Sequence, residues 1–210
     1  MKKLVLAVLA VLLVAPAALA EGWGVGVKLG AGQNDPKTMK DFYDEGFDLG
    51  ATSKELDKNP GYFSLEVLHE WALNDEANKI GAKIGWDMYG ENELKLKAPG
   101  DSAKLTETTY SFPFTVYYKR DNGIKNFSWF AGAGFTILHS KMEASGVEDD
   151  DVSKTKVFPH IVVGGEYRFT QVFALGLEAR YNIAAKVKKD GATLSDRSGF
   201  GAALTGRFYF

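Results

Sequence analysis

The sequence contains no cysteine, only three histidines and no block of basic residues. Without cysteine the chain forms no disulfides and has no acceptor for the lipid of a bacterial lipoprotein, and three scattered histidines leave little for a metal site. Lysine and arginine total 25 against 27 acidic residues, a balance that argues against nucleic acid as a partner. After residue 20 no apolar run approaches the roughly 20 residues of a transmembrane helix, which excludes a helical membrane protein but leaves membrane strands open.

The first 20 residues have the pattern of a secretory signal peptide. Lys2 and Lys3 give a positive start, residues 4–14 are uninterruptedly apolar, and residues 18–20 (Ala-Leu-Ala) form a small-x-small cleavage site. The apolar run is too short for an uncut membrane anchor. We therefore predict an exported chain, cleaved after residue 20, in which residues 21–210 form a single domain. Loss of both lysines changes the net charge from −2 to −4.

The chain ends in a strand whose two faces differ. Over residues 200–210 apolar or small side chains occupy every second position up to the terminal Phe210, while Gly, Ala, Thr, Arg and Tyr occupy the other face. A period of two is the pattern of a β-strand with a different environment on each side. The pattern recurs along the chain, each time over about 10 residues or more, as a tilted membrane strand needs. The eight predicted strands are 22–30, 63–71, 79–88, 109–119, 127–137, 157–169, 173–183 and 200–210.

The predicted connections alternate between long and short. The long ones are 33–60, 91–106, 141–155 and 186–198, and the short ones are 74–78, 121–125 and 170–171. Outer-membrane barrels have short turns on the periplasmic side and long loops outside. The predicted fold class is therefore all-β, a closed eight-stranded antiparallel up-and-down transmembrane barrel. We find no helical period long enough to suggest a second domain.

Two features place the apolar face against lipid rather than inside a soluble, lipocalin-like barrel. The polar face is rich in glycine, for example at Gly26, Gly132 and Gly176, which suits a crowded lumen and has no value on a wet exterior. The apolar face carries aromatic residues near one end of the strands, as in the aromatic girdle of membrane barrels. The predicted periplasmic girdle comprises Trp23, Trp71, Tyr118, Phe127, Trp129, Phe169, Phe173 and Phe208, together with Phe210.

Three short segments resemble a known group. Residues 129–135 (WFAGAGF), 164–169 (GGEYRF) and 207–210 (RFYF) are similar to strands of the small outer-membrane β-barrels of Gram-negative bacteria, the superfamily of the OmpA membrane domain, OmpX and OmpW. The resemblance implies an integral outer-membrane barrel in contact with lipid and lipopolysaccharide. It also implies a C-terminal signal read by the barrel-assembly machinery, here Leu204, Phe208 and Phe210. It implies no single function, because fold and function separate.

The inward-facing positions carry a nearly balanced set of charges. The predicted lumen charge network comprises Lys28, Glu66, Glu70, Lys83, Asp87, Lys119, Glu166, Arg168, Glu178, Arg180 and Arg207. Because an unpaired charge in a narrow interior is costly, we expect these groups to be paired. Glu178 and Arg180 lie two apart on one face, so both are expected to join Arg168, Glu166 or Arg207. We favour a structural network that plugs the barrel over a path for an ion or small solute, because eight strands leave no open channel.

Catalysis finds little support in the sequence. His139 and Ser140 are adjacent, and neighbours on a strand point to opposite faces, so they cannot easily form a nucleophile and its base. The lipid A deacylases of related barrels use a His-x-Ser spacing, from which this sequence departs. We therefore expect no catalytic residues, no metal and no cofactor.

Two other roles stay open. Apolar side chains at inward positions suggest an OmpW-like channel for small, partly apolar solutes, although we prefer the interpretation that they fill the barrel ends. These positions are Phe130, Leu138, Phe158, Val162 and Val172. The first long loop is more apolar than a solvated loop needs, and it would fold over the barrel mouth or dock an extracellular partner. Its apolar residues are Met39, Phe42, Tyr43, Phe47 and Leu49.

Overall fold

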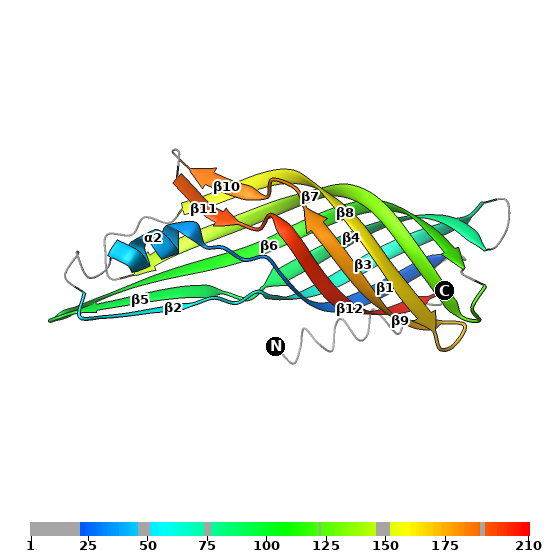
Figure 1. Ribbon diagram of the computed structural model, residues 1–210, viewed down its shortest axis with the longest axis horizontal. Coiled ribbons are helices and arrows are strands. Elements are labelled where there is room, and N and C mark those ends of the chain that lie inside the picture. Colours follow the sequence, from blue (N-terminus) through cyan, green and yellow to red (C-terminus); the bar gives the residue numbers. More distant parts are fainter. Residues whose placement is uncertain (1–21, 46–50, 74–76, 122, 146–151, 190–191) are drawn as a thin grey trace.

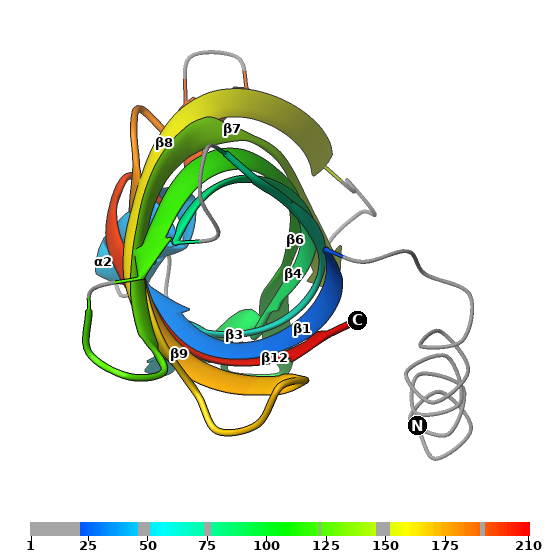
Figure 2. The ribbon, with the colours of Figure 1, turned by 90° about the vertical axis from the view of Figure 1, so that its right-hand side faces the viewer.

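The computed structural model describes residues 22–45, 51–73, 77–121, 123–145, 152–189 and 192–210, so the predicted signal peptide (1–20) lies outside the described residues. The strands of the barrel are β1 (Trp23–Gly32), β3 (Gly61–Ala72), β4 (Asn78–Tyr89), β6 (Asp101–Asp121), β7 (Phe127–Ser145), β8 (Val152–Arg168), β9 (Phe173–Asn182) and β12 (Gly199–Tyr209). They pair in the order β6-β4-β3-β1-β12-β9-β8-β7, and β7 pairs back to β6 (Figures 1 and 2). The predicted closed, eight-stranded antiparallel barrel is confirmed.

The two ends of the chain meet at the seam between β1 and β12. Val25 lies opposite Phe208, and the antiparallel register continues along both strands. The backbone N–H of Phe210 donates to the Trp23 carbonyl at 2.8 Å, and the N–H of Gly22 donates to the Phe210 carbonyl at 3.0 Å. Each barrel strand therefore has a partner on both sides, which removes the unpaired edges of an open sheet.

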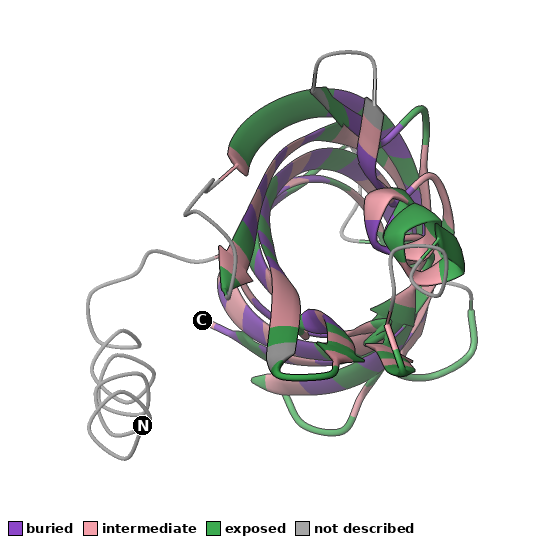
Figure 3. Cartoon of the chain, turned by 90° about the vertical axis from the view of Figure 1, so that its left-hand side faces the viewer, coloured by how far each residue is buried: buried purple, intermediate pink, exposed green. Residues whose placement is uncertain are grey.

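Burial alternates along the barrel strands in the sense that the sequence predicts (Figure 3). On β3, Ser64 and Glu66 are buried, whereas Phe63 and Val67 on either side of this pair are exposed. On the outer face Leu177 is 68% exposed and Phe200 is 74% exposed. The barrel is polar inside and apolar outside, which is the reverse of a soluble barrel and the arrangement of a barrel surrounded by lipid. Within the described residues, no helix has the length and apolar character needed to cross a bilayer.

The long connections contain regular secondary structure, which the sequence analysis did not predict. The first contains a helix, α2 (Lys37–Glu45), and a strand, β2 (Ser53–Asp57). The second contains β5 (Asn92–Ala98), which pairs with the outer part of β6 on one side and with β2 on the other. The fourth forms a hairpin of β10 (Lys186–Lys189) and β11 (Ala192–Asp196). Strands β6, β7 and β8 also continue past their predicted ends, because their backbone groups find partners in one another.

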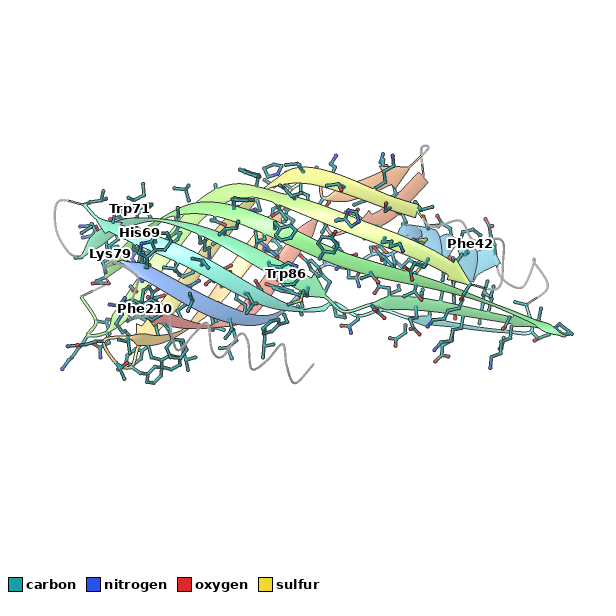
Figure 4. All side chains as sticks on the ribbon, turned by 180° about the vertical axis from the view of Figure 1, so that it is seen from behind. Phe42, His69, Trp71, Lys79, Trp86 and Phe210 are labelled. Atoms are coloured by element: carbon teal, nitrogen blue, oxygen red, sulfur yellow. The ribbon has the colours of Figure 1, made fainter. Side chains whose placement is uncertain are left out.

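These segments form a folded cap at one end of the barrel, which we define as residues 35–45, 53–57, 92–108, 138–145, 152–158, 184–189 and 192–197 (Figure 1). Figure 4 places Phe42 of α2 at this end, and His69, Trp71, Lys79 and Phe210 at the opposite end. The cap has two small hydrophobic cores. One is Met39, Leu94 and Met142, and the other is Leu138, Phe158, Ala185, Val187 and Leu194.

Candidate functional site in the barrel lumen

Arg207 on β12 contacts three carboxylates that come from three other strands. Its Nε donates to Glu66 Oε1 at 2.7 Å, its Nη1 to Glu166 Oε2 at 2.9 Å and its Nη2 to Glu178 Oε2 at 3.1 Å. All four side chains are buried. They meet because every second residue of a barrel strand points into the same narrow lumen. Arg207 is therefore the centre of the charge network.

Two lysines share the same carboxylates. Lys28 Nζ lies 2.7 Å from Glu66 Oε2 and donates to Glu178 Oε1 at 2.8 Å. Lys83 Nζ forms an ion pair with Glu178 and lies 3.8 Å from Glu66. Together with Arg207, these lysines surround two buried acids with three cations. Such clustering keeps every charge paired in a region that excludes most water.

Lys119 extends the network toward the end of the barrel opposite the cap. Its Nζ donates to Glu70 Oε1 at 3.0 Å and forms a second ion pair with Glu166. The Tyr117 hydroxyl donates to Glu70 at 2.9 Å, and the Tyr209 hydroxyl donates to Glu166 Oε2 at 2.8 Å. The phenol groups thus add a second hydrogen bond to carboxylate oxygens that Lys119 and Arg207 also contact. Sequence reasoning missed both tyrosines, although their inward parity could have indicated them.

Arg180 forms a separate group nearer the cap. Its Nη2 donates to Asp87 Oδ2 at 2.7 Å, and the Ser111 hydroxyl donates to the same oxygen at 3.1 Å. We expected Arg180 to join Arg168, Glu166 or Arg207, and that expectation is wrong. Because the lumen is narrow, Arg180 on β9 reaches across to Asp87 on β4. Glu178 and Arg180 therefore bind different partners, although they lie two residues apart on the same strand. Glu178, by contrast, does contact Arg207.

Arg168 lies apart from the other predicted network residues. Its guanidinium carbon is 4.6 Å from the centre of the Tyr209 ring, and the side chain is half-buried. No ion pair of Arg168 occurs within the described residues. Arg168 lines an open pocket of about 730 Å³ at the end opposite the cap, with His69, Trp71, Lys79 and other residues of the strand ends (Figure 4).

A second polar cluster, which sequence reasoning missed, lies beneath the cap. Glu107 is fully buried and accepts hydrogen bonds from Asn92 Nδ2 at 2.7 Å, from the Ser140 hydroxyl at 3.0 Å and from the Thr109 hydroxyl at 3.3 Å. Glu107 lies between the predicted connection 91–106 and the predicted strand 109–119, so the sequence does not assign it to the inward face. Its alternation with Thr109 and Ser111 is the signal that could have found it.

Arg197 follows β11 and is buried under the cap. Its guanidinium carbon lies 4.2 Å from the centre of the Tyr89 ring. None of its three guanidinium nitrogens has a hydrogen-bond partner among the described residues, and burial lowers the pKa of Arg197 from its usual value. The negative charge of Glu107 opposes this shift. Stacking on the phenol ring and the field of Glu107 thus hold this cation in place.

The structure keeps His139 and Ser140 apart. His139 lies on the outer face, with its ring centre 4.9 Å from that of Tyr110, whereas the Ser140 hydroxyl points inward to Glu107. His160 is buried between two threonine hydroxyls, those of Thr115 and Thr136, at 2.9 Å each. Within the part of the chain that the structure describes, no three acidic or histidine side chains gather as a metal site would require.

The aromatic residues predicted for the girdle lie near strand ends on the side opposite the cap. Trp23 and Trp71 flank His69, with ring centres 4.8 and 4.4 Å from the imidazole. Phe173 is 5.0 Å from Phe208 and 6.2 Å from Phe169. The ring centres of Tyr118 and Trp129 are 5.7 Å apart, and Phe127 begins β7. Leu204 and Phe208 of the predicted assembly signal are exposed on the outer face, but the recognition of this signal stays a prediction.

Comparison with known proteins identifies the family. The model of the outer membrane protein beta-barrel domain matches residues 4–208. No curated protein matches significantly by sequence. Among solved structures, the chain is similar to Neisserial surface protein A, with 16% identity, a TM-score of 0.50, and coverage of 90% of this chain and 98% of that one. It is also similar to the attachment invasion locus protein Ail of Yersinia pestis, with 14% identity, a TM-score of 0.47, and coverage of 90% and 99%. The chain belongs to the outer membrane protein beta-barrel domain family and is an integral barrel of the bacterial outer membrane.

Proposed function

We propose that this protein is a plugged, non-enzymatic barrel that anchors a folded cap on the outside of the cell, where the cap interacts with extracellular partners. The observation that carries the proposal is the cap itself. It has two hydrophobic cores of its own outside the lipid-facing belt. A barrel with a purely structural role in the membrane needs no ordered surface there, whereas recognition of a partner needs one.

The charge network in the lumen supports the proposal that the barrel is plugged. Five buried acids and five buried bases interlock between the strands, from Arg180 and Asp87 near the cap to Lys119 and Glu70 near the other end. An ion or solute that crossed the barrel would have to displace these pairs, and eight strands leave no room beside them. Apolar residues fill further space, since Phe130 and Val162 pack against Tyr117.

An OmpW-like path for small apolar solutes is the weaker alternative. Four of the five apolar residues that suggested it are buried in packed clusters, which supports filling rather than a passage. The fifth, Val172, is 52% exposed in the short turn between β8 and β9, so its expected inward position is wrong because it lies beyond the strand ends. Catalysis on lipid A has even less support, because His139 and Ser140 face opposite sides.

The proposed orientation can be tested by cysteine labelling, because the natural chain has no cysteine. With the cap outside, a single cysteine at the exposed Lys97, near the end of β5, should react with a membrane-impermeant maleimide on intact cells. A cysteine at the exposed Lys125, in the short turn before β7, should react only after the outer membrane is permeabilised. Labelling of Lys125→Cys but not Lys97→Cys on intact cells would reverse the orientation.

Replacement of residues 36–58 by a short Gly-Ser linker tests the function. The ends of this segment are close, since Asn34 Nδ2 donates to the Asn59 carbonyl at 2.8 Å. The barrel should still fold, as shown by its heat-modifiable migration in a gel, but expressing cells should lose most of their attachment to host cells and matrix-coated surfaces. Conductance in planar bilayers should stay near background in both proteins, because the lumen network is intact.

The exchange Lys97→Gln on the cap surface serves as the matched control and should leave attachment and folding unchanged. Attachment that survives removal of 36–58 would contradict the role of the cap. A stable, ohmic conductance of the natural barrel would contradict the plug.

A further inference from the structure

The end of the barrel opposite the cap opens into a pocket of about 730 Å³, which is within the size range of ligand pockets. Its lining comes from β3, β4 and β12, from the ends of β1 and β8, and from the turn after β8. Figure 4 labels His69, Trp71, Lys79 and Phe210 at this end. The other lining residues are Gly22, Glu70, Ala72, Arg168, Gln171, Val172 and Tyr209.

A layer of paired side chains closes the inner side of this pocket. Lys119 Nζ donates to Glu70 Oε1 at 3.0 Å and to the Tyr209 hydroxyl at 3.1 Å, and Glu70 and Tyr209 both line the pocket. All three side chains are buried. A ligand that enters from this end is therefore held at the mouth and does not pass into the lumen.

Arg168 and Lys79 add two positive charges to a buried network that is balanced without them. The acids of that network are Glu66, Glu70, Asp87, Glu166 and Glu178, and its bases are Lys28, Lys83, Lys119, Arg180 and Arg207. Arg168 has no ion pair within the described residues, and Lys79 Nζ approaches Glu70 Oε2 only to 3.9 Å. Because Glu70 already accepts hydrogen bonds from Lys119 and Tyr117, the mouth keeps an excess of positive charge.

The Arg168 side chain is arranged to bind an oxyanion. Its guanidinium carbon lies over the Tyr209 ring, 4.6 Å from the ring centre, and its backbone N–H donates to the Asn126 carbonyl at 2.8 Å. A cation–π contact leaves the five guanidinium N–H groups free to donate. Within the part of the chain that the structure describes, the Arg168 guanidinium donates no hydrogen bond. A carboxylate fits this planar fork through two parallel hydrogen bonds.

The surfaces beside Arg168 favour a carboxylate that is carried on a carbon chain. Trp71 and Val172 on the rim are 50% and 52% exposed. They offer apolar contact area, and the neighbouring Gln171 offers a side-chain amide for hydrogen bonds. An inorganic anion would use none of these groups, whereas an acidic peptide presents carboxylates, methylene groups and amides together.

We propose that this pocket binds an acidic peptide, with Arg168 holding a carboxylate through its N–H fork and Lys79 supplying a second positive charge. With the cap outside the cell, as proposed above, the peptide would belong to a partner in the periplasm. The barrel would then carry one interaction site on each side of the membrane. Binding by the purified barrel depends neither on this orientation nor on the role of the cap.

The test measures peptide binding to the refolded mature barrel in a neutral detergent, by fluorescence anisotropy. The probe is a peptide of three glutamates with blocked ends and an uncharged fluorophore, and the reference is the same peptide with three glutamines. The natural protein should bind the glutamate peptide at least about tenfold more tightly than the glutamine peptide. R168Q should lose about tenfold or more in affinity for the glutamate peptide, and K79Q should lose less.

The matched variant R120Q removes an exposed arginine at the same end but outside the pocket, and should bind like the natural protein. Heat-modifiable migration checks that each variant is folded. Competition on the natural protein needs no variant: unlabelled glutamate peptide should displace the probe at a lower concentration than inorganic phosphate does at the same ionic strength. Natural affinity in folded R168Q, or equal affinity of the natural protein for the two peptides, would overturn the proposal. Displacement by phosphate at the lower concentration would assign the pocket to an inorganic anion and would also overturn it.

Discussion

Replacing Arg207 with glutamine is expected to lower the free energy of unfolding of the barrel by about 3–5 kcal/mol, the range for breaking one side of a buried ion pair. Arg207 donates to Glu66, Glu166 and Glu178 at 2.7, 2.9 and 3.1 Å. Its loss removes the cation that contacts all three buried carboxylates, so their negative charge is less well neutralised. Residual lumen water would bring the loss toward the lower end of this range. Urea titration of the barrel refolded in lipid vesicles measures the change.

The exposed Arg120, also near the end opposite the cap, provides the control, and Arg120→Gln should change stability by less than about 0.5 kcal/mol. The double variant Arg207→Gln with Glu166→Gln should recover part of the loss, because it removes one of the uncompensated charges. Conductance should remain near background in these variants, since side-chain packing also fills the lumen. Full stability of Arg207→Gln, combined with a measurable pore, would show that the network is a gate rather than a plug.

Adding a single methyl group at Gly134 is expected to disrupt the pairing of β6 with β7. Gly134 lies opposite Thr115, and a Cβ built on it would come within 1.8 Å of the Phe114 carbonyl oxygen. Because the obstacle is backbone, no side chain can move aside. Overpacking of this kind costs about 1–3 kcal/mol or more. We expect Gly134→Ala to reduce the heat-modifiable fraction sharply and to lower the urea midpoint.

Gly206 on β12 provides the comparison, because a Cβ there would have its nearest neighbour at 3.7 Å, an ordinary van der Waals distance. Gly206→Ala should therefore fold with nearly the natural yield. If the two variants fold equally well, close approach of β6 and β7 at Gly134 is not what requires glycine in this strand.

The sequence by itself determined the barrel. A strand that has lipid on one side and a narrow polar lumen on the other must alternate with a period of two, and this constraint acts on every residue that crosses the membrane. All eight predicted strands are present, and Glu66, Glu178 and Arg207 point inward as their parity indicates. The same constraint explains why the outward side chains of β8, such as Val157 and Ile161, could be assigned without a structure.

The tertiary structure alone decided the cap and the pairing of charges. Residues 92–98 alternate as well, with Leu94 and Leu96 between charged residues, but over fewer residues than a membrane strand needs, and their strand is completed by backbone partners on β2 and β6. The partner of an inward charge depends on the register of strands far apart in sequence, which is why Arg180 reaches Asp87. Burial of Glu107 and Arg197 likewise follows from the folded hairpin and the outer parts of β6 and β7. The residue pattern of a strand reflects the environment on each of its two faces. Contacts across the lumen and within the cap form only once the barrel has closed.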